Sequence, residues 1–248
     1  MSCAERQIGS KQDYAVCGET EGTRFAFVAD GHGTSKCIDF LRSIDPVSIA
    51  TAENPPDFIF ELLQSIGNTF QSGFTFTFAR IVHNKIQVWN VGDSETHVFL
   101  DGALVYKTPA HSFLNDAELE RTKHLVSVVN PTKAPFPVSD GRVELVLSPT
   151  GMFTTGENLV MTMAFGHNNM TGLVPSFWER DVGAESIRIV GGSDGFFDML
   201  VPIHAGTADE LADAAVERWQ QQWEFFDGKN VVMTNYGGGY DDVAVFVL

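Results

Sequence analysis

Residues 25–33 read Phe-Ala-Phe-Val-Ala-Asp-Gly-His-Gly. The apolar run 25–29 predicts a strand buried on both faces. Gly31 and Gly33 favour a sharp turn where this strand ends. A carboxylate at the end of a buried strand is costly unless a positive group meets it. Because the chain has few cations, we expect a divalent metal ion to be the partner of Asp30.

Length and composition limit the classes of protein to consider. The 248 residues are 44% hydrophobic, and no stretch has the composition of a linker, so we predict a single domain over residues 1–248. The formal net charge is −16, from 32 acidic residues against 16 lysines and arginines. No basic stripe is present to neutralise phosphates, which argues against nucleic acid as a partner.

The cysteines and the hydropathy predict the cellular setting. Cys3, Cys17 and Cys37 are odd in number and lack a C-x-x-C spacing, which argues against a secreted disulfide framework and a cysteine zinc site. No apolar run approaches the ~18 residues of a membrane helix, and the N-terminus has no hydrophobic signal core. We therefore expect a soluble, intracellular (cytoplasmic) monomer with no membrane partner.

Three further aspartates lie where an apolar segment meets a turn. Asp13 precedes the run 14–17, Asp194 follows the run 186–190, and Asp241 precedes the run 243–248. Each alone is an ordinary turn residue, but together with Asp30 they indicate a shared site. Carboxylate oxygens suit Mg²⁺ or Mn²⁺ rather than zinc. Two such ions can share a bridging water and hold it in line with a phosphorus atom.

The pattern of apolar residues predicts mixed secondary structure. Predicted strands cover 14–17 and 24–29 (a hairpin that brings Asp13 near Asp30), 74–78, 86–91, 96–100 and 103–106 (an antiparallel meander), 142–147, 186–190 and 243–248. Predicted helices cover 34–42, 57–71, 114–126 and 207–226, with a helical turn at 196–200 and a loop at 130–142. The predicted buried faces are Phe58, Leu62, Ile66 and Phe70 in the second helix, and Leu211, Ala215, Trp219, Trp223 and Phe226 in the last, which opens on a capping box at Thr207. The alternation of Phe74, Phe76 and Phe78 with threonines predicts a half-buried strand.

Several short motifs occur in an order that resembles the PP2C-type (PPM) protein phosphatases. They are Lys11-Gln12-Asp13, Asp30-Gly31-His32-Gly33, Val91-Gly92-Asp93-Ser94, Thr108-Pro109-Ala110-His111-Ser112, Ser193-Asp194-Gly195-Phe196-Phe197-Asp198 and Asp241-Asp242-Val243. The resemblance spans roughly residues 9–248. It implies an α+β fold: a four-layer α-β-β-α sandwich with two antiparallel sheets packed face to face and helices outside.

The resemblance also implies an activity and a set of roles. The activity is metal-dependent hydrolysis of phosphoserine and phosphothreonine in a phosphorylated protein substrate, with two Mg²⁺ or Mn²⁺ ions. Asp30 would bridge both ions, and the Gly31 carbonyl would bind one of them. Asp194 and Asp241 would hold the other ion, Asp13 would bind directly or through water, and His32 would be the general acid. Asp93 and Asp198 are interpreted as structural, and His167 as a surface or core residue.

Four positions depart from the pattern of the resembling family. Ile8 stands where an arginine commonly grips phosphate, with Arg6 or Lys11 as substitutes; Ala110 replaces an aspartate of a third metal site; Met163-Ala164-Phe165-Gly166-His167 lacks both charges of its motif; and Asp242 replaces an asparagine. These changes keep the two-metal core and weaken phosphate binding. The alternative hypotheses are therefore a pseudophosphatase, a binding or regulatory module on the same fold, and a metal-dependent hydrolase of small phosphoesters.

Overall fold

The computed structural model describes residues 1–112, 115–122, 126–128, 143–144, 151–153, 159, 161–199, 201–221, 223–226, 231–234 and 240–248. Its main body consists of two five-stranded antiparallel sheets. The first has the order β1-β18-β15-β8-β9, from Ser2–Arg6, Val243–Val247, Ile187–Gly192, Glu95–Leu100 and Ala103–Lys107. The second has the order β14-β7-β6-β3-β2, from Ser176–Asp181, Lys85–Val91, Phe76–Val82, Thr23–Ala29 and Tyr14–Thr20.

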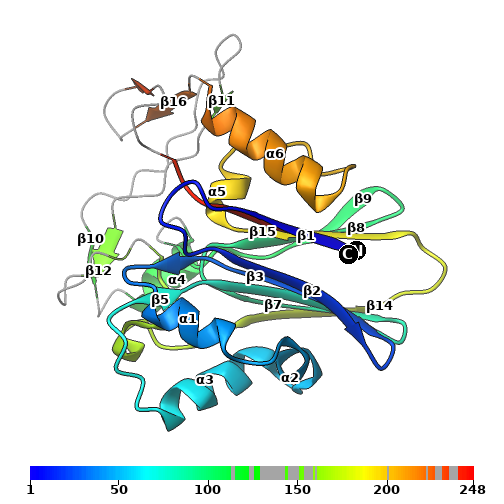
Figure 1. The fold of residues 1–248 in the computed structure, drawn as a ribbon, viewed down its shortest axis with the longest axis horizontal. Coiled ribbons are helices and arrows are strands. Elements are labelled where there is room, and N and C mark those ends of the chain that lie inside the picture. Colours follow the sequence, from blue (N-terminus) through cyan, green and yellow to red (C-terminus); the bar gives the residue numbers. More distant parts are fainter. Residues whose placement is uncertain are drawn as a thin grey trace.

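Helices cover the outer face of each sheet, which confirms the predicted four-layer arrangement (Figure 1). Helices α1 (Lys36–Arg42), α2 (Pro46–Thr51) and α3 (Pro55–Ser65) lie on the second sheet, and α5 (Asp194–Phe197) and α6 (Ala208–Trp219) lie on the first. The remaining elements are α4 (Asp116–Thr122), the 3₁₀ turn η1 (His167–Asn169), and the strands β4 (Gly31–His32), β5 (Gly73–Phe74), β10 (Val126–Val128), β11 (Val143–Glu144), β12 (Gly151–Phe153), β13 (Phe165–Gly166), β16 (Trp223–Phe226) and β17 (Val231–Thr234).

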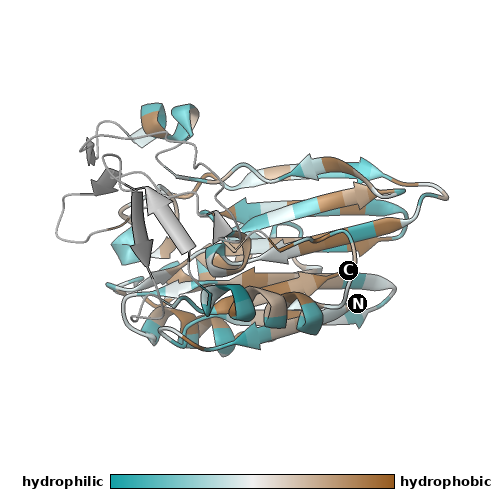
Figure 2. Ribbon diagram, turned by 90° about the horizontal axis from the view of Figure 1, so that it is seen from above, coloured by the Kyte–Doolittle hydropathy of each residue, from teal (hydrophilic) through white to brown (hydrophobic). Residues whose placement is uncertain are grey.

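Three hydrophobic clusters separate the layers. Phe27, Phe76 and Phe78 belong to an aromatic cluster under α1–α3, and Val245 packs in a cluster under α6. Aliphatic residues such as Val28 and Ile189 fill the space between the sheets. Long hydrophobic segments follow the strands in Figure 2. The run 25–29 is buried throughout, as the sequence predicts for a strand covered on both sides.

The predicted hairpin is confirmed, whereas the predicted meander is wrong. β2 and β3 pair from Tyr14 opposite Ala29. β6 and β7 lie in one sheet and β8 and β9 in the other, so the chain crosses the sandwich at the turn that contains Gly92. Gly92 has φ of 102°, and a Cβ there would lie 2.5 Å from the side chain of Thr75. Only glycine allows this crossing at so little cost.

The strand around Phe76 is not half-buried, because Thr75 and Thr77 are also fully buried. Their hydroxyls form hydrogen bonds of 2.6 and 2.7 Å with Ser94, directly before β8, and with Thr96 of β8 in the opposite sheet. A buried threonine is tolerated when its hydroxyl is paired. The alternating phenylalanines and threonines therefore face two different buried layers, rather than one buried layer and solvent.

Two predicted helices are shorter than expected. Prolines at the first two positions and the Asn54 cap begin α3 at Pro55, and the helix ends before Gly67, which has φ of 89°. The most deeply buried side chains of its central turns are Ile59 and Leu63. Of the predicted face, Phe58 and Phe70 pack against the core while partly exposed, whereas Ile66 is 52% exposed, so the predicted face was only partly correct.

The capping box at Thr207 and Glu210 is confirmed, with Leu211, Ala215 and Trp219 buried. However, α6 ends at Trp219, and the segment Trp223–Phe226 is a strand paired with β17. Aromatic residues suit a strand as well as a helix, so helical spacing alone did not separate the two.

The other predicted elements meet the described residues only in part. Helix α4 covers Asp116–Thr122 of the predicted 114–126, and β11 covers Val143–Glu144 of the predicted 142–147. The predicted loop 130–142 lies outside the described residues. None of the helices within the described residues has the length and hydropathy of a membrane span.

Candidate functional site

Four acidic turns lie at the same end of the sandwich because of how the strands pair. Asp13 directly precedes β2 and Asp30 directly follows β3, and β2 and β3 pair there from Tyr14 opposite Ala29. Asp194 follows β15 and Asp241 precedes β18, and these strands pair antiparallel, with Gly192 opposite Val245. Each sheet thus supplies two of the predicted site aspartates.

The electrostatics show that these aspartates are close neighbours. Burial, followed by the charges of neighbouring carboxylates, raises the pKa of Asp30 well above its usual value, with Asp194 and Asp13 as the leading charges. Burial likewise raises the pKa of Asp13 well above its usual value, with added repulsion from Asp194 and Asp241. Burial and nearby carboxylates raise the pKa of Asp194 to about 6 and of Asp241 to about 7. The structure therefore gathers Asp13, Asp30, Asp194 and Asp241 from both sheets.

Glycines let the acidic turns touch one another. A Cβ on Gly31 would lie 2.9 Å from the Cβ and the carbonyl oxygen of Gln12, beside Asp13. A Cβ on Gly195 would collide with the carbonyl oxygen of Asp242. The glycine after Asp30 and the glycine after Asp194 are therefore needed for the approach of a neighbouring acidic turn, in addition to any role in turning the chain.

Asp242 holds the N-terminal acidic turn in place. Its buried carboxylate accepts hydrogen bonds from the Gly9 amide (2.6 Å), the Ser10 hydroxyl (3.0 Å) and the Gln12 amide (3.0 Å). Three donors converge on one side chain, so a carboxylate, which only accepts, suits this position better than an asparagine amide. This contact explains the departure from the family pattern at Asp242.

The donor set fits a hard cation. Oδ2 of Asp13 is buried and has no hydrogen-bond partner among the described residues. The principal charges acting on Asp13, Asp30 and Asp194 are all carboxylates, and clustered buried carboxylates require a cation or protons. Within the described part of the chain, no three His, Cys, Asp or Glu side chains are already arranged to hold a metal ion. The four aspartates lie near one another, but their carboxylates do not surround a common point.

Asp93 and Asp198, which the sequence analysis interpreted as structural residues, lie beside this cluster. Burial raises the pKa of Asp93 to about 6, and its charge acts on both Asp194 and Asp30. Burial and the charge of Asp194 raise the pKa of Asp198 well above its usual value. In the sequence, Asp93 follows a glycine and Asp198 lies in the same motif as Asp194. These local signals did not show how close the two side chains come to the other aspartates.

His32 follows Gly31 and contacts a histidine 135 positions away in the chain. Nδ1 of His32 lies 2.7 Å from Nε2 of His167, and Nε2 of His32 is buried with no hydrogen-bond partner among the described residues. Burial lowers the pKa of His32 to about 3. Sequence reasoning assigned no ligand role to His167; its place in a motif that normally ends in a charged residue was the only signal of a functional position.

The predicted substitutes for the missing arginine differ in their availability. Ile8 packs against the hydrophobic cluster under α6. Arg6 forms ion pairs of 3.0 and 2.7 Å with Asp209 and Asp213 on α6, so it is committed elsewhere. Lys11 is exposed, directly before Gln12 and Asp13. Arg42 donates to the backbone carbonyl of Asp13 (2.9 Å) and pairs with Asp39.

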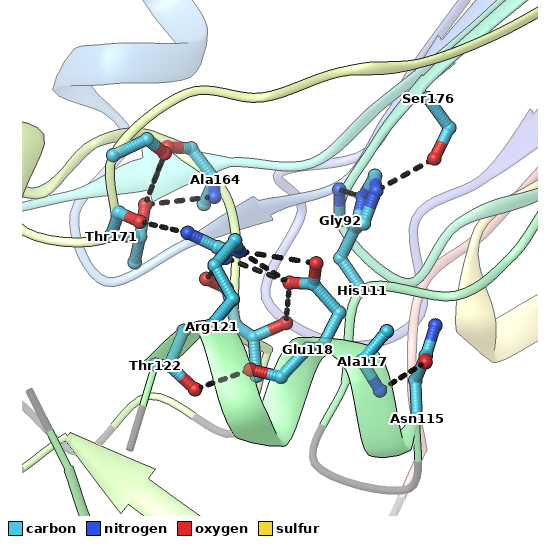
Figure 3. A network of polar contacts seen from close by, with 12 residues as sticks. Gly92, His111, Asn115, Ala117, Glu118, Arg121, Thr122, Ala164, Thr171 and Ser176 are labelled. Carbon is cyan, nitrogen blue, oxygen red and sulfur yellow. Dashed lines mark hydrogen bonds and ion pairs between the residues drawn. The ribbon is translucent and has the colours of Figure 1, made fainter. Parts of the chain in front are cut away.

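Arg121 and Glu118 of α4 are the centre of a polar network (Figure 3). Arg121 of α4 donates to the carbonyls of Thr162 (2.7 Å) and Thr171 (3.0 Å), on either side of His167. Glu118 pairs with Arg121 at 2.7 Å and accepts from the Thr162 hydroxyl at 2.6 Å. In the same view His111, next to Ala110, accepts from the Gly92 amide at 3.0 Å and contacts Ser176 at 2.9 Å, which makes it structural.

Known structures share this architecture. A C. elegans sex-determining protein is similar with a TM-score of 0.62 and 17% identity over 99% of this chain, which spans 63% of that protein. A bacterial serine phosphatase (0.59, 16%) and an S. agalactiae serine/threonine phosphatase (0.56, 16%) are similar over 99% of this chain and 95% and 98% of theirs. No protein-family model and no curated protein sequence matches the chain. At these identities the likeness concerns the fold, which is that of the PP2C-type serine/threonine phosphatases.

Proposed function

We propose that this chain is a Mg²⁺- or Mn²⁺-dependent protein serine/threonine phosphatase whose substrate is a phosphorylated protein. The observation that carries the proposal is the gathering of Asp13, Asp30, Asp194 and Asp241 from two sheets into one partly buried acidic cluster. Burying several carboxylates together is unfavourable for stability, and such pKa shifts are concentrated at functional sites. The PP2C-like fold supports the same interpretation.

The roles follow from the chemistry of the donors. Asp30 and the Gly31 carbonyl, with Asp13, would hold metal on the side of the second sheet, and Asp194 and Asp241 on the side of the first. Bound cations would lower the pKa of the attacking water and neutralise the charge of the phosphate. Gly31 and Gly195 allow the acidic turns to approach, and Asp242 holds the turn before Asp13. His32 would protonate the departing seryl or threonyl oxygen through Nε2, and the negative charge of the bound phosphate would raise the pKa of His32 from its low value in the free protein.

Release of phosphate from a phosphothreonine peptide tests the proposal. We expect turnover with Mn²⁺ or Mg²⁺ and none after chelation, with recovery when the metal is returned. Activity that survives thorough chelation would exclude this mechanism. Nucleotides and sugar phosphates in the same assay separate a phosphoprotein phosphatase from a hydrolase of small phosphoesters.

A pseudophosphatase is the second candidate, and the arginine contacts favour it. Ile8 replaces the phosphate-binding arginine of the resembling family, and Arg6 is engaged by Asp209 and Asp213. Titration calorimetry with Mn²⁺ separates the candidates: a phosphatase requires two occupied sites, whereas a binding module requires none. An absence of Mn²⁺ binding, together with no turnover on any phosphopeptide, would favour the pseudophosphatase.

A further inference from the structure

The turn that contains His167, which contacts His32, has an unusual backbone conformation. His167, Asn168 and Asn169 have φ of 44°, 51° and 58°, three consecutive left-handed residues without glycine. Residues other than glycine rarely adopt this backbone conformation. Surrounding contacts offset its cost in free energy. Arg121 provides two of these contacts by binding Thr162 and Thr171 on either side of the turn.

The small sheet β13-β5-β4 brings the two histidines together. His32 lies opposite Gly73, and Gly73 lies opposite Gly166, which directly precedes His167. A Cβ on Gly73 would collide with the ring of His167 and with the carbonyl oxygen of Phe165. The missing side chain at Gly73 is therefore the space that the imidazole of His167 occupies beside His32.

The hydrogen bonds of His167 determine the direction of its contact with His32. Nδ1 of His167 lies 2.8 Å from the backbone carbonyl oxygen of Gln71. A carbonyl only accepts, so this nitrogen carries a proton, and in neutral His167 Nε2 is then the acceptor. The two rings are inclined by only 19°, and their nitrogens approach to 2.7 Å, which is hydrogen-bond distance rather than ring-stacking distance. His32 therefore donates from Nδ1 to Nε2 of His167.

We propose that His167 is a positioning residue for the general acid: it accepts the Nδ1 proton of His32 and so fixes the orientation in which Nε2 of His32 faces the substrate. This inference rests on the proposed phosphatase function. Because Nδ1 is held by His167, a proton that His32 gives to the departing oxygen has to come from Nε2. As water attacks phosphorus, the bond between phosphorus and the seryl or threonyl oxygen breaks. The electron pair of this bond passes to the seryl or threonyl oxygen. That oxygen takes the Nε2 proton, and neutral His32 stays hydrogen-bonded to His167.

The test compares two substrates whose leaving groups differ. An alkoxide such as that of threonine requires protonation, whereas 4-nitrophenolate leaves readily without it. In His167→Phe, which keeps a ring but removes the acceptor, we expect kcat for a phosphothreonine peptide to fall about 10- to 100-fold. We expect kcat for 4-nitrophenyl phosphate to change less than about 3-fold. His167→Gln, which restores an acceptor, should recover most of the loss.

Controls separate this proposal from a structural role and from failure of the proposed function. Asn169→Gly, at an exposed position of the same left-handed turn, should leave both rates unchanged. Equal losses on both substrates in His167→Phe, or no loss on either, would overturn the proposal.

A spectroscopic measurement does not depend on turnover. ¹⁵N NMR should show His32 protonated at Nδ1 in the unmodified protein and in His167→Gln, and a mixture of tautomers in His167→Phe. If the unmodified protein hydrolyses neither substrate with Mn²⁺, the proposed function fails, and the NMR result alone decides the contact: an Nδ1 without its proton in the unmodified protein would refute it.

Discussion

The turns Asp30-Gly31 and Asp194-Gly195 share a sequence pattern but lead into different secondary structure. Both end a buried apolar strand. After Gly31 the chain stays extended, and β4 pairs with β5 and carries His32 toward His167. After Asp194 the chain enters α5, and the Gly195 carbonyl accepts a hydrogen bond of 2.7 Å from the Trp219 indole of α6.

The difference shows how one local pattern serves two purposes. The Asp30 turn places an acid and a histidine at the same site, whereas the Asp194 turn attaches an acid to the helical layer. Asp-Gly after an apolar strand therefore predicts where a carboxylate lies. The residues after the glycine decide whether the turn supplies reactive groups or support.

The largest expected effect is the loss of activity in Asp30→Asn and in Asp194→Asn. Each change removes one proposed metal-binding charge, so we expect Mn²⁺-dependent kcat to fall at least about 10³-fold. Thermal unfolding without metal should show equal or higher stability, because a neutral amide avoids burying a charge. Turnover close to that of the unmodified protein in either variant would contradict the proposed roles of these turns.

The glycines distinguish the two turns by stability. Gly195→Ala places a Cβ against the backbone oxygen of Asp242, which cannot yield easily, so we expect a loss of about 3 kcal/mol. Gly31→Ala meets Gln12 at 2.9 Å and Ile38 at 3.1 Å, and we expect a loss of about 1–2 kcal/mol. Urea unfolding measures both values. The reverse order would show that the Asp30 turn is the more tightly packed one.

The dependence of stability on pH tests how Asp93 acts on the two turns. Its pKa is raised to about 6 in the folded protein, so between pH 4 and 6 the folded state binds more protons than the unfolded state. This contribution is complete below about pH 4 and is lost as the pH rises through 6, on the order of 2–3 kcal/mol. We expect Asp93→Asn to flatten this slope in metal-free protein, measured by urea unfolding. An unchanged slope would indicate that Asp93 keeps an ordinary pKa.

The smallest expected effect is at Asp242, which ties residues 9–12 to the turn containing Asp241. Asp242→Asn replaces one acceptor oxygen with an amide group that faces donors, and we expect a loss of about 1–2 kcal/mol. Asp181→Asn, whose side chain is 86% exposed, is the matched control and should change stability by less than about 0.5 kcal/mol. Equal effects of the two substitutions would remove the structural role of Asp242.

Local sequence determined the elements with strong periodicity or turn chemistry. The buried strand before Asp30, the hairpin that this strand forms with β2, and the capping box at Thr207 all have their predicted form. Burial patterns and capping depend on near neighbours in the chain, so they can be recognised without a fold. The predicted end of α3 was wrong because the helix stops before Gly67, which has positive φ. The predicted end of α6 was wrong because aromatic residues suit a strand as well as a helix.

Tertiary structure decided what the acids and histidines meet. The sequence predicted a shared site and a hairpin that brings Asp13 near Asp30, which the strand pairing from Tyr14 opposite Ala29 confirms. Only the pairing of β15 with β18 placed Asp194 beside Asp241. The contact of His167 with His32 joins residues 135 positions apart and requires the bare backbone of Gly73 between them. Neither partner's own neighbours in the chain encode that contact, because a hydrogen bond depends on distances that arise only after the sheets have packed.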